Sequence, residues 1–143
     1  MLKINEYRKV ESLEEAYELN QKKNNKIIAG GVWMKIGDRR IATAIDLSGL
    51  GLDQITETDT EFVIGAMTTL REIEKHAGLA AYTDGAIRES VRHIVGVQFR
   101  NCATVGGSIF GRFGFSDVLT VFLAMDTQVE LYHAGMVSLK EFI

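Results

Sequence analysis

Hydrophobic and polar residues alternate along the chain in short blocks, which predict a succession of small helices and strands. Behind Ser12, apolar residues recur at helical spacing, and Glu15 follows Ser12 at the separation typical of a capping box. This pattern predicts a helix over residues 12–23. The apolar run at 26–29 and the alternating run at 43–47 then predict two short strands.

The middle of the chain predicts a pair of strands followed by a helix. Residues 53–59 and 61–66 alternate around a turn at 59–60, as expected for two short strands. Thr69 and Glu72 repeat the capping-box spacing and predict a helix that begins there. The inner face of this helix consists of Leu70, Ile73 and Ala77.

Three further elements are predicted in the second half of the chain. Residues 84–95 form a helix, residues 118–125 are almost all apolar and suit a helix buried on most sides, and residues 128–132 form a last strand. The apolar side of the helix at 84–95 consists of Ile87, Val91 and Ile94. This succession of short strands and helices indicates an α+β or α/β domain.

Composition narrows the class of protein. The chain has 143 residues, enough for one domain with its own core, and its net charge of −3 without a basic stripe argues against a nucleic-acid partner. The single cysteine, Cys102, cannot form an internal disulfide and is predicted to be a small core residue. No apolar run approaches the roughly 20 residues of a membrane span, and the N-terminus lacks the apolar core of a signal peptide. We expect a cytoplasmic protein without a membrane or nucleic-acid partner.

The stretch "NKIIAGGVWMKIG" ends its apolar run at two adjacent glycines, Gly30 and Gly31. Adjacent glycines permit a positive φ and leave the backbone bare of side chains. One interpretation is a tight turn at the end of the strand. The other is an anion-binding loop, in which backbone N–H groups face a phosphate. The stretch alone does not decide between them.

A second glycine pair, Gly106 and Gly107, also follows a short apolar stretch. Two such pairs in strand-end loops would form two faces of one cleft, in which peptide N–H groups neutralise a pyrophosphate without a lysine. Farther along, Ser116 and Asp117 stand where the long apolar helix begins. Either residue is a candidate N-cap, and the alternative for Asp117 is to accept hydrogen bonds from ribitol or ribose hydroxyls.

Other motifs for nucleotides, metals and nucleophilic catalysis are missing. The chain has no G-x-G-x-x-G fingerprint of the required spacing, no phosphate loop ending in Lys-Ser or Lys-Thr, and no nucleophile elbow. His76, His93 and His133 are dispersed and have no carboxylates at ligand spacing, so we expect no metal site and no catalytic residue.

Four segments together resemble a known family. These are "IIAGGVWM", "GAMTTLREIE", "QFRNCATVGGS" and "SDVLTVFLAMDTQVEL", and they resemble in order the FAD-binding domain of the molybdenum hydroxylases. That family includes the flavoprotein subunits of xanthine dehydrogenase and carbon monoxide dehydrogenase type enzymes. The resemblance implies an α+β fold of two small subdomains, at about 1–50 and 51–143, with FAD between them. Members usually continue into a C-terminal domain, which these 143 residues do not include.

The resemblance also implies which residues bind FAD. Lys26 would lie near the adenosine part, and Ile94 would be the apolar side chain near the isoalloxazine ring. Asp117, with Ser116 beside it, would bind a hydroxyl of the FAD chain. The loop around the pyrophosphate would consist of Ala29, Gly30, Gly31, Val32, Trp33 and Met34. The opposite wall would consist of Thr104, Gly106, Gly107 and Ser108.

The chain departs from the family pattern at several of these positions. Gly111 lacks an expected side-chain hydroxyl, whereas Arg112 would bring a positive charge toward the phosphate. Val32 and Trp33 replace polar residues, so the loop would depend more on its backbone. Trp33 is interpreted as core packing or as a contact beside the flavin, and both alternatives also hold for the phenylalanines of "GRFGF", Phe113 and Phe115.

The function implied by the resemblance is electron transfer. The chain would be an FAD-binding oxidoreductase subunit that passes electrons from iron–sulfur clusters to NAD or another acceptor. The partners would be a molybdopterin-binding large subunit and a 2Fe-2S small subunit, because this chain has no cysteine set for a cluster. The alternative is a degenerate or truncated member that binds flavin weakly and serves as a structural or assembly module.

Overall fold

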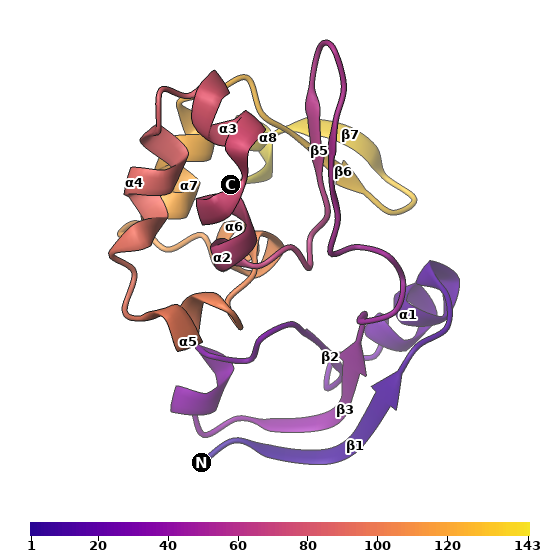
Figure 1. Cartoon of the computed structure of the whole chain (residues 1–143). Helices are drawn as coiled ribbons and strands as arrows, with labels where there is room; N and C mark the ends of the chain where they lie inside the picture. The colour runs from indigo at the N-terminus through magenta and orange to yellow at the C-terminus, as the bar shows by residue number, and fades with distance from the viewer.

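The computed structural model describes residues 1–143, and its N-terminal part is a three-stranded parallel sheet covered by one helix (Figure 1). The strands are β1 (Lys3–Lys9), β2 (Lys26–Ile28) and β3 (Arg40–Asp46), in the order β1-β3-β2. Helix α1 (Leu13–Asn20) connects β1 to β2. We call these elements the parallel-sheet unit. The strands predicted at 26–29 and 43–47 are confirmed as β2 and the second half of β3.

The start of α1 differs from the predicted capping box. The Ser12 hydroxyl accepts the Glu15 N–H at 3.1 Å, as predicted, but the Glu15 carboxylate accepts the N–H of Glu11 at 2.9 Å and not that of Ser12. Glu15 also pairs with Arg8 at 2.7 Å, so this carboxylate fixes the end of β1 against the helix. The helix ends at Asn20, before the predicted residue 23.

Strand β1 was not predicted from the sequence pattern. All seven of its residues are exposed, because the strand lies at the edge of the sheet and pairs only with β3. Such a strand needs no apolar alternation, and its charged residues suit an unpaired edge. The periodicity that identifies half-buried strands is therefore missing here.

The rest of the chain forms a helical unit with two β-hairpins (Figure 1). Hairpin strands β4 (Ile55–Glu57) and β5 (Phe62–Ile64) confirm the predicted pair, and β6 (Gln128–Leu131) confirms the predicted last strand and pairs with β7 (Gly135–Ser138). The helices are α2 (Leu70–Lys75), α3 (Ala77–Tyr82), α4 (Ala86–Arg92), α5 (Val97–Arg100), α6 (Val105–Gly111), α7 (Asp117–Leu123) and α8 (Leu139–Phe142).

Two predicted helices end earlier than expected. The Thr69–Glu72 capping box is confirmed, but α2 ends at Lys75, and Ala77 begins α3 instead of continuing the inner face of α2. His76 interrupts the helix because its Nδ1 accepts the Leu79 N–H at 3.1 Å and caps the next helix. The helix predicted at 84–95 ends at Arg92, so Ile94 lies beyond it.

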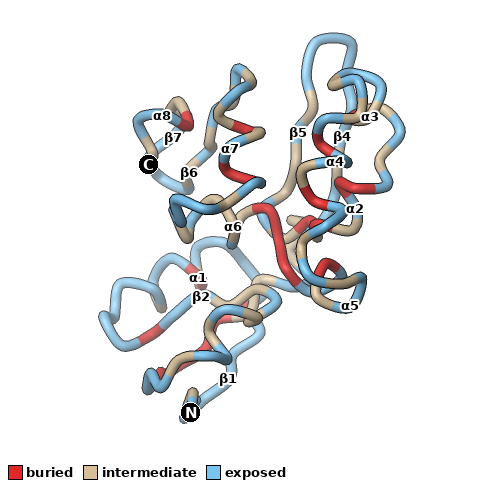
Figure 2. The backbone as a smooth tube through the Cα atoms, turned by 90° about the vertical axis from the view of Figure 1, so that its left-hand side faces the viewer, coloured by how far each residue is buried: buried red, intermediate tan, exposed pale blue.

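Each unit has its own hydrophobic core, and buried segments occur in both (Figure 2). In the helical unit, eleven buried residues, among them Ile73, Ile87 and Val91, bring together α2, α4, α6 and α7. In the parallel-sheet unit the core is small and consists of Val10, Ala16 and Ile45. The prediction that Cys102 is a core residue is wrong, because this cysteine is exposed. No helix is both long enough and apolar enough to cross a membrane.

Candidate functional site

The first glycine pair follows β2 and begins a segment whose backbone donors are free. Six consecutive N–H groups, from Ala29 to Met34, have no hydrogen-bond acceptor within the chain. The next N–H, of Lys35, donates to the Gly31 carbonyl at 2.9 Å and closes the turn into the short 3₁₀ helix η1 (Met34–Ile36). Gly31 has a φ of +68°, a value that glycine adopts readily, so the turn depends on this residue. We call residues 29–34 the donor loop.

The donor loop packs against the helical unit. A Cβ atom at Gly30 would overlap the Cys102 carbonyl group, so only glycine permits this approach of the two backbones. Two residues later, the Val32 side chain packs against the core of the helical unit. The segment that precedes the second glycine pair therefore lies directly beside the first pair, and the prediction that the two motifs meet is confirmed in this respect.

The second glycine pair lies in a helix and not in a strand-end loop. Gly106 and Gly107 occupy the first turn of α6, whose N-cap is Thr104. The sequence pattern did not reveal this helix because its first turn contains two glycines, which are poor helix formers. The correction changes what these residues offer to a ligand, because the N–H groups of a capped helix turn have acceptors of their own.

All four N–H groups at the start of α6 donate within the chain. Val105 donates to Thr68 at 2.9 Å and Gly106 to the carbonyl of Ala66 at 3.0 Å. Gly107 donates to the Thr104 hydroxyl at 3.1 Å, and the Ser108 N–H donates to the Thr104 carbonyl at 3.0 Å. The expectation that peptide N–H groups of this wall are free to face a pyrophosphate is therefore wrong for Gly106, Gly107 and Ser108. Among the predicted residues of this wall, only Thr104 has an N–H without an acceptor in the chain.

Gly106 has a packing role that the sequence did not indicate. A Cβ atom there would lie 2.6 Å from the Ala66 carbonyl oxygen, so the residue must be glycine for α6 to contact the segment before α2. At Gly107 the one close neighbour of a Cβ atom would be the Thr104 hydroxyl, at 3.0 Å. An antiparallel β-bridge between Thr69 and Thr104 joins the same two segments of the chain.

At the start of α7, Ser116 and Asp117 have different roles. The Ser116 hydroxyl accepts the Leu119 N–H at 3.1 Å, so this residue is the N-cap. The Asp117 side chain is exposed and accepts no hydrogen bond within the chain. Its carboxylate is free to accept hydrogen bonds from a ligand, which keeps the binding interpretation open for Asp117.

Lys26 and Ile94 are the predicted site residues that lie outside these segments. Lys26 is at the opposite end of β2 from the glycine pair, and its ammonium group donates to the Lys23 carbonyl at 2.9 Å. Ile94 is half-buried and packs against the same core as Val32. The structure therefore relates Ile94 to the donor loop through a shared core, and it places Lys26 apart from that loop.

A buried ion pair holds the backbone at Ile94. The Arg100 guanidinium donates to the Glu74 carboxylate at 2.8 Å and to the Ile94 carbonyl at 3.1 Å. Arg71 pairs with the same carboxylate at 2.8 Å. Burial raises the pKa of Glu74, but the hydrogen bonds from Arg100 and Arg71 outweigh it, and the pKa lies below its ordinary value. Val95, the next residue after Ile94, has a φ of +52°, which is strained for a β-branched side chain.

The aromatic residues beside the glycine motifs form one surface cluster. The Trp33 ring contacts those of Phe113 and Phe115, with centroids 5.2 and 5.8 Å away. Because the Trp33 side chain is exposed, the interpretation that it packs in the core is wrong. Gly111 permits this cluster, since a Cβ atom there would lie 2.8 Å from the Phe113 ring. Arg112, which was expected to bring a positive charge toward the phosphate, has its guanidinium engaged at α8 instead. It donates to the Phe142 carbonyl at 3.1 Å and covers the Phe142 ring.

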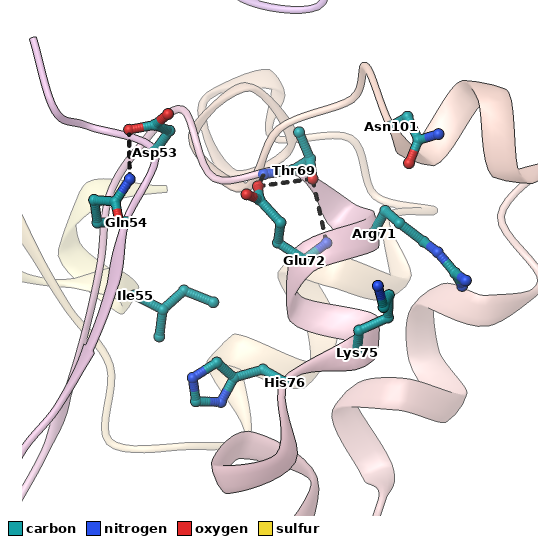
Figure 3. Close-up of a pocket in the computed structure, with 9 residues that line it drawn as sticks. All are labelled: Asp53, Gln54, Ile55, Thr69, Arg71, Glu72, Lys75, His76 and Asn101. Carbon is teal, nitrogen blue, oxygen red and sulfur yellow. Dashed lines mark hydrogen bonds between the residues drawn. The ribbon is translucent and has the colours of Figure 1, made fainter. Parts of the chain in front are cut away.

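A pocket of about 640 Å³ lies elsewhere, between α2 and the segment that leads into β4 (Figure 3). It is lined by Asp53, Gln54, Ile55, Thr69, Arg71, Glu72, Lys75, His76 and Asn101. None of the predicted FAD-binding residues lines it. Glu72 is already engaged with Thr69 in the helix cap, and Ile55 is the one hydrophobic residue in the lining. A flavin ring needs a more apolar surface, so we assign the candidate site to the donor loop instead.

The residues present fit a dinucleotide diphosphate. Free N–H groups on six consecutive residues suit its phosphate oxygens, and the bare backbone at Gly30 and Gly31 permits close approach. The free carboxylate of Asp117 suits a sugar hydroxyl. Fold and site together therefore define an α+β domain of the nucleotide-binding class.

The chain belongs to the family described as the FAD binding domain in molybdopterin dehydrogenase, whose model matches residues 2–143. The predicted family, the α+β fold, the cofactor FAD and the assignment to an oxidoreductase family are thereby confirmed. Sequence reasoning missed the partners of the glycines, which are the Cys102 carbonyl and the Ala66–Thr68 segment. The small residues of "GAMTT" were their only signal.

Known proteins resemble the chain over nearly its whole length. It is 27% identical to the uncharacterized protein YgfM of Escherichia coli (strain K12), over 98% of the chain and 54% of that protein, so it spans about half the length of this relative. A carbon monoxide dehydrogenase from Hydrogenophaga pseudoflava, which lacks the Mo-pyranopterin moiety of its molybdenum cofactor, is similar with a TM-score of 0.81 and 26% identity, over 93% of the chain and 49% of the solved one.

Two other solved structures share the fold. Quinoline 2-oxidoreductase from Pseudomonas putida 86 matches with a TM-score of 0.82 and 22% identity, over 96% of the chain and 51% of that one. A Cu,Mo-CO dehydrogenase in its cyanide-inactivated form matches with a TM-score of 0.83 and 24% identity, over 97% and 52%.

Proposed function

We propose that the chain binds FAD and serves as the flavin-binding electron-transfer unit of a molybdenum-containing hydroxylase or dehydrogenase. The single observation that carries this proposal is the run of six free N–H groups on Ala29–Met34, beside the approach of Gly30 to Cys102. Family membership supports the same conclusion. When bound, FAD supplies the redox chemistry, which no side chain of this protein can supply.

The residues of the chain bind and orient the cofactor. The donor loop holds the diphosphate through its backbone, and Asp117 accepts a hydrogen bond from a hydroxyl of the FAD chain. Ile94 contributes an apolar surface for the isoalloxazine ring, at a position held by Arg100. Gly106, Gly107 and Ser108 complete the site by packing, because their backbone donors are already engaged, whereas the Thr104 N–H has no acceptor within the chain and adds one donor from the opposite wall. Lys26, at the start of β2 and apart from the donor loop, lies near the adenosine part of the cofactor.

The remaining parts of the proposal concern organisation and partners. FAD lies between two subdomains, at about 1–50 and 51–143, each with its own core. A molybdopterin-binding large subunit and a 2Fe-2S small subunit supply electrons, and NAD or another oxidant accepts them in the cytoplasm. The likeness to a carbon monoxide dehydrogenase with a molybdenum cofactor supports the molybdopterin partner, and the lack of a cysteine set in this chain supports a separate iron–sulfur subunit.

The experiment that tests the proposal is to incubate the purified chain with FAD, remove free ligand and measure flavin absorbance and binding by calorimetry. A 1:1 complex with micromolar or tighter affinity supports the proposal. A chain that is folded by circular dichroism but does not bind FAD would refute it. Riboflavin, which lacks phosphate, is the matched control and should bind much more weakly.

A further inference from the structure

Three aromatic side chains beside the donor loop form an exposed cluster, which we call the aromatic cluster: Trp33, Phe113 and Phe115. The Phe113 and Phe115 rings are stacked, 5.2 Å apart with 16° between their planes, and the Trp33 ring lies 5.2 Å from Phe113 and 5.8 Å from Phe115. Trp33 is 51% exposed and Phe115 68% exposed. None of the three belongs to either hydrophobic core. The cluster therefore presents aromatic surface to solvent.

The cluster joins the two chain segments of the candidate site. Trp33 is part of the donor loop, and its own N–H is one of the six free donors. Phe115 directly precedes the N-cap Ser116, and the free carboxylate of Asp117 follows. Between the two phenylalanines, Gly114 leaves open space, since a Cβ atom there would meet nothing within 4 Å. Aromatic surface thus lies beside the free donors of the donor loop, and the free carboxylate follows two residues after Phe115.

An exposed aromatic surface next to a diphosphate-binding loop matches the chemistry of a dinucleotide. Such a ligand carries a planar π-ring at each end of its diphosphate, and stacking on aromatic side chains stabilises bound rings. The core of the helical unit already contains its own phenylalanines, including Phe122 at 5% exposure, so the fold has no need of three exposed aromatic side chains at the surface.

We propose that the aromatic cluster is a stacking surface for one planar ring of the bound dinucleotide. This inference rests on the proposed function, because it assigns the ring to the ligand whose diphosphate the donor loop holds. The ring is either the adenine or the isoalloxazine, which share the stacking chemistry and are separated by the experiment below.

The test compares three ligands on four proteins by calorimetry. The ligands are FAD, ADP, which carries only the adenine end, and FMN, which carries only the isoalloxazine end. The proteins are the wild type, Trp33→Leu, Phe115→Leu and the control Phe110→Leu. Phe110 is 71% exposed, lies outside the cluster and faces Arg112 instead, so its replacement controls for loss of an exposed ring.

We expect Trp33→Leu and Phe115→Leu each to weaken FAD binding by roughly 5- to 150-fold, the range for loss of one ring stack, with Phe110→Leu unchanged. If the cluster variants lose as much affinity for ADP as for FAD and none for FMN, the stacked ring is the adenine. If they lose affinity for FMN and none for ADP, the stacked ring is the isoalloxazine. Unchanged FAD affinity in both cluster variants overturns the inference. If the wild type does not bind FAD at all, the proposed function fails instead.

A measurement on the unmutated protein covers the case in which a variant does not fold. Trp33 is the only tryptophan of the chain, so its fluorescence reports on the cluster alone. Quenching of this fluorescence by saturating ADP supports stacking of the adenine. If ADP binds by calorimetry but leaves the fluorescence unchanged, adenine stacking is excluded. If, in addition, a folded Phe115→Leu variant binds FMN as tightly as the wild type does, the inference is overturned.

Discussion

Gly30 lies against the carbonyl group of Cys102, in a contact that no other residue at position 30 could make, because a Cβ atom would overlap the Cys102 oxygen. The two residues belong to different glycine-bearing segments, one after β2 and one before α6. Their contact fixes the donor loop to the helical unit, and the position of the six free N–H groups depends on it.

Replacement of Gly30 by alanine should therefore disturb both stability and ligand binding. We expect Gly30→Ala to lower the free energy of unfolding by about 1–3 kcal/mol, the usual cost of overpacking, and to weaken FAD binding because the donor loop is displaced. Gly37→Ala, in the same segment between β2 and β3, is the control, since its Cβ would lie 3.6 Å from the Met34 oxygen, an ordinary contact. Denaturant unfolding and calorimetry measure the two effects. Wild-type behaviour of Gly30→Ala would refute the role of the contact.

Gly31 tests the conformation of the donor loop separately from its packing. A Cβ atom at this position would meet nothing within 4 Å, but φ is +68°. Gly31→Ala should therefore cost about 1–2 kcal/mol through backbone strain alone and weaken FAD binding by roughly 5- to 30-fold if the strain reshapes the loop. Gly31→Asn should retain more affinity, because asparagine tolerates the left-handed region. Equal affinities for the alanine and asparagine variants would contradict this account.

Replacements of Ser116 and Asp117 should distinguish the effect of helix capping on stability from the effect of ligand contacts on FAD binding. Ser116→Ala removes the N-cap of α7 and should lower the free energy of unfolding by about 1 kcal/mol. Asp117→Ala should change stability by less than about 1 kcal/mol, through the helix dipole, but weaken FAD binding by about 1–2 kcal/mol. Thermal unfolding and FAD titration of both variants measure the difference. Unchanged FAD affinity in Asp117→Ala would leave that residue with no role in binding.

The buried pair of Glu74 and Arg100 makes stability depend on pH in acid. Because the pKa of Glu74 is lowered by folding, the ionised carboxylate stabilises the protein above its ordinary pKa of 4.5, and this stabilisation is lost as the pH falls through the lower folded value. Glu74→Gln should cost about 3 kcal/mol at pH 7, since Arg100 then lacks its partner, and the difference from wild type should shrink below pH 4.5.

Glu89→Gln is the matched control for this prediction. Glu89 pairs with Arg92 at 2.9 Å, but both side chains are about half exposed, so its replacement should cost less than about 1 kcal/mol at any pH. Urea unfolding of wild type and both variants between pH 3 and pH 7 measures the dependence. A pH-independent difference between wild type and Glu74→Gln would show that the carboxylate charge is not what stabilises the pair.

Much of the fold could be predicted from local signals, and the exceptions have physical causes. The capping box of Thr69 and Glu72 and the apolar run of α7 identified their helices, because both signals act within a few residues. Strand β1 was missed because an exposed edge strand has no apolar face. Helix α6 was missed because Gly106 and Gly107 weaken its propensity, and its first turn is stabilised by carbonyls from a distant segment.

The sequence predicted that the two glycine motifs lie close together, but not that they have different roles. Two glycine pairs look alike in sequence, yet Gly31 creates free donors whereas Gly106 permits a close packing contact with Ala66. The difference depends on where the other segments of the fold supply acceptors, which no local pattern records. The contacts of Trp33 and Arg112 could not be predicted for the same reason, since their neighbours are fixed only by the tertiary structure.

The most direct test of the central claim is to follow the backbone amides of the chain by nuclear magnetic resonance while FAD is added. If residues 29–34 hold the diphosphate, their amide signals should shift most and their hydrogen exchange should slow, whereas the Gly107 amide, already bonded to Thr104, should gain no protection. Binding of FAD with the largest changes elsewhere, for example around Arg71 and Lys75, and none at residues 29–34 would contradict the claim.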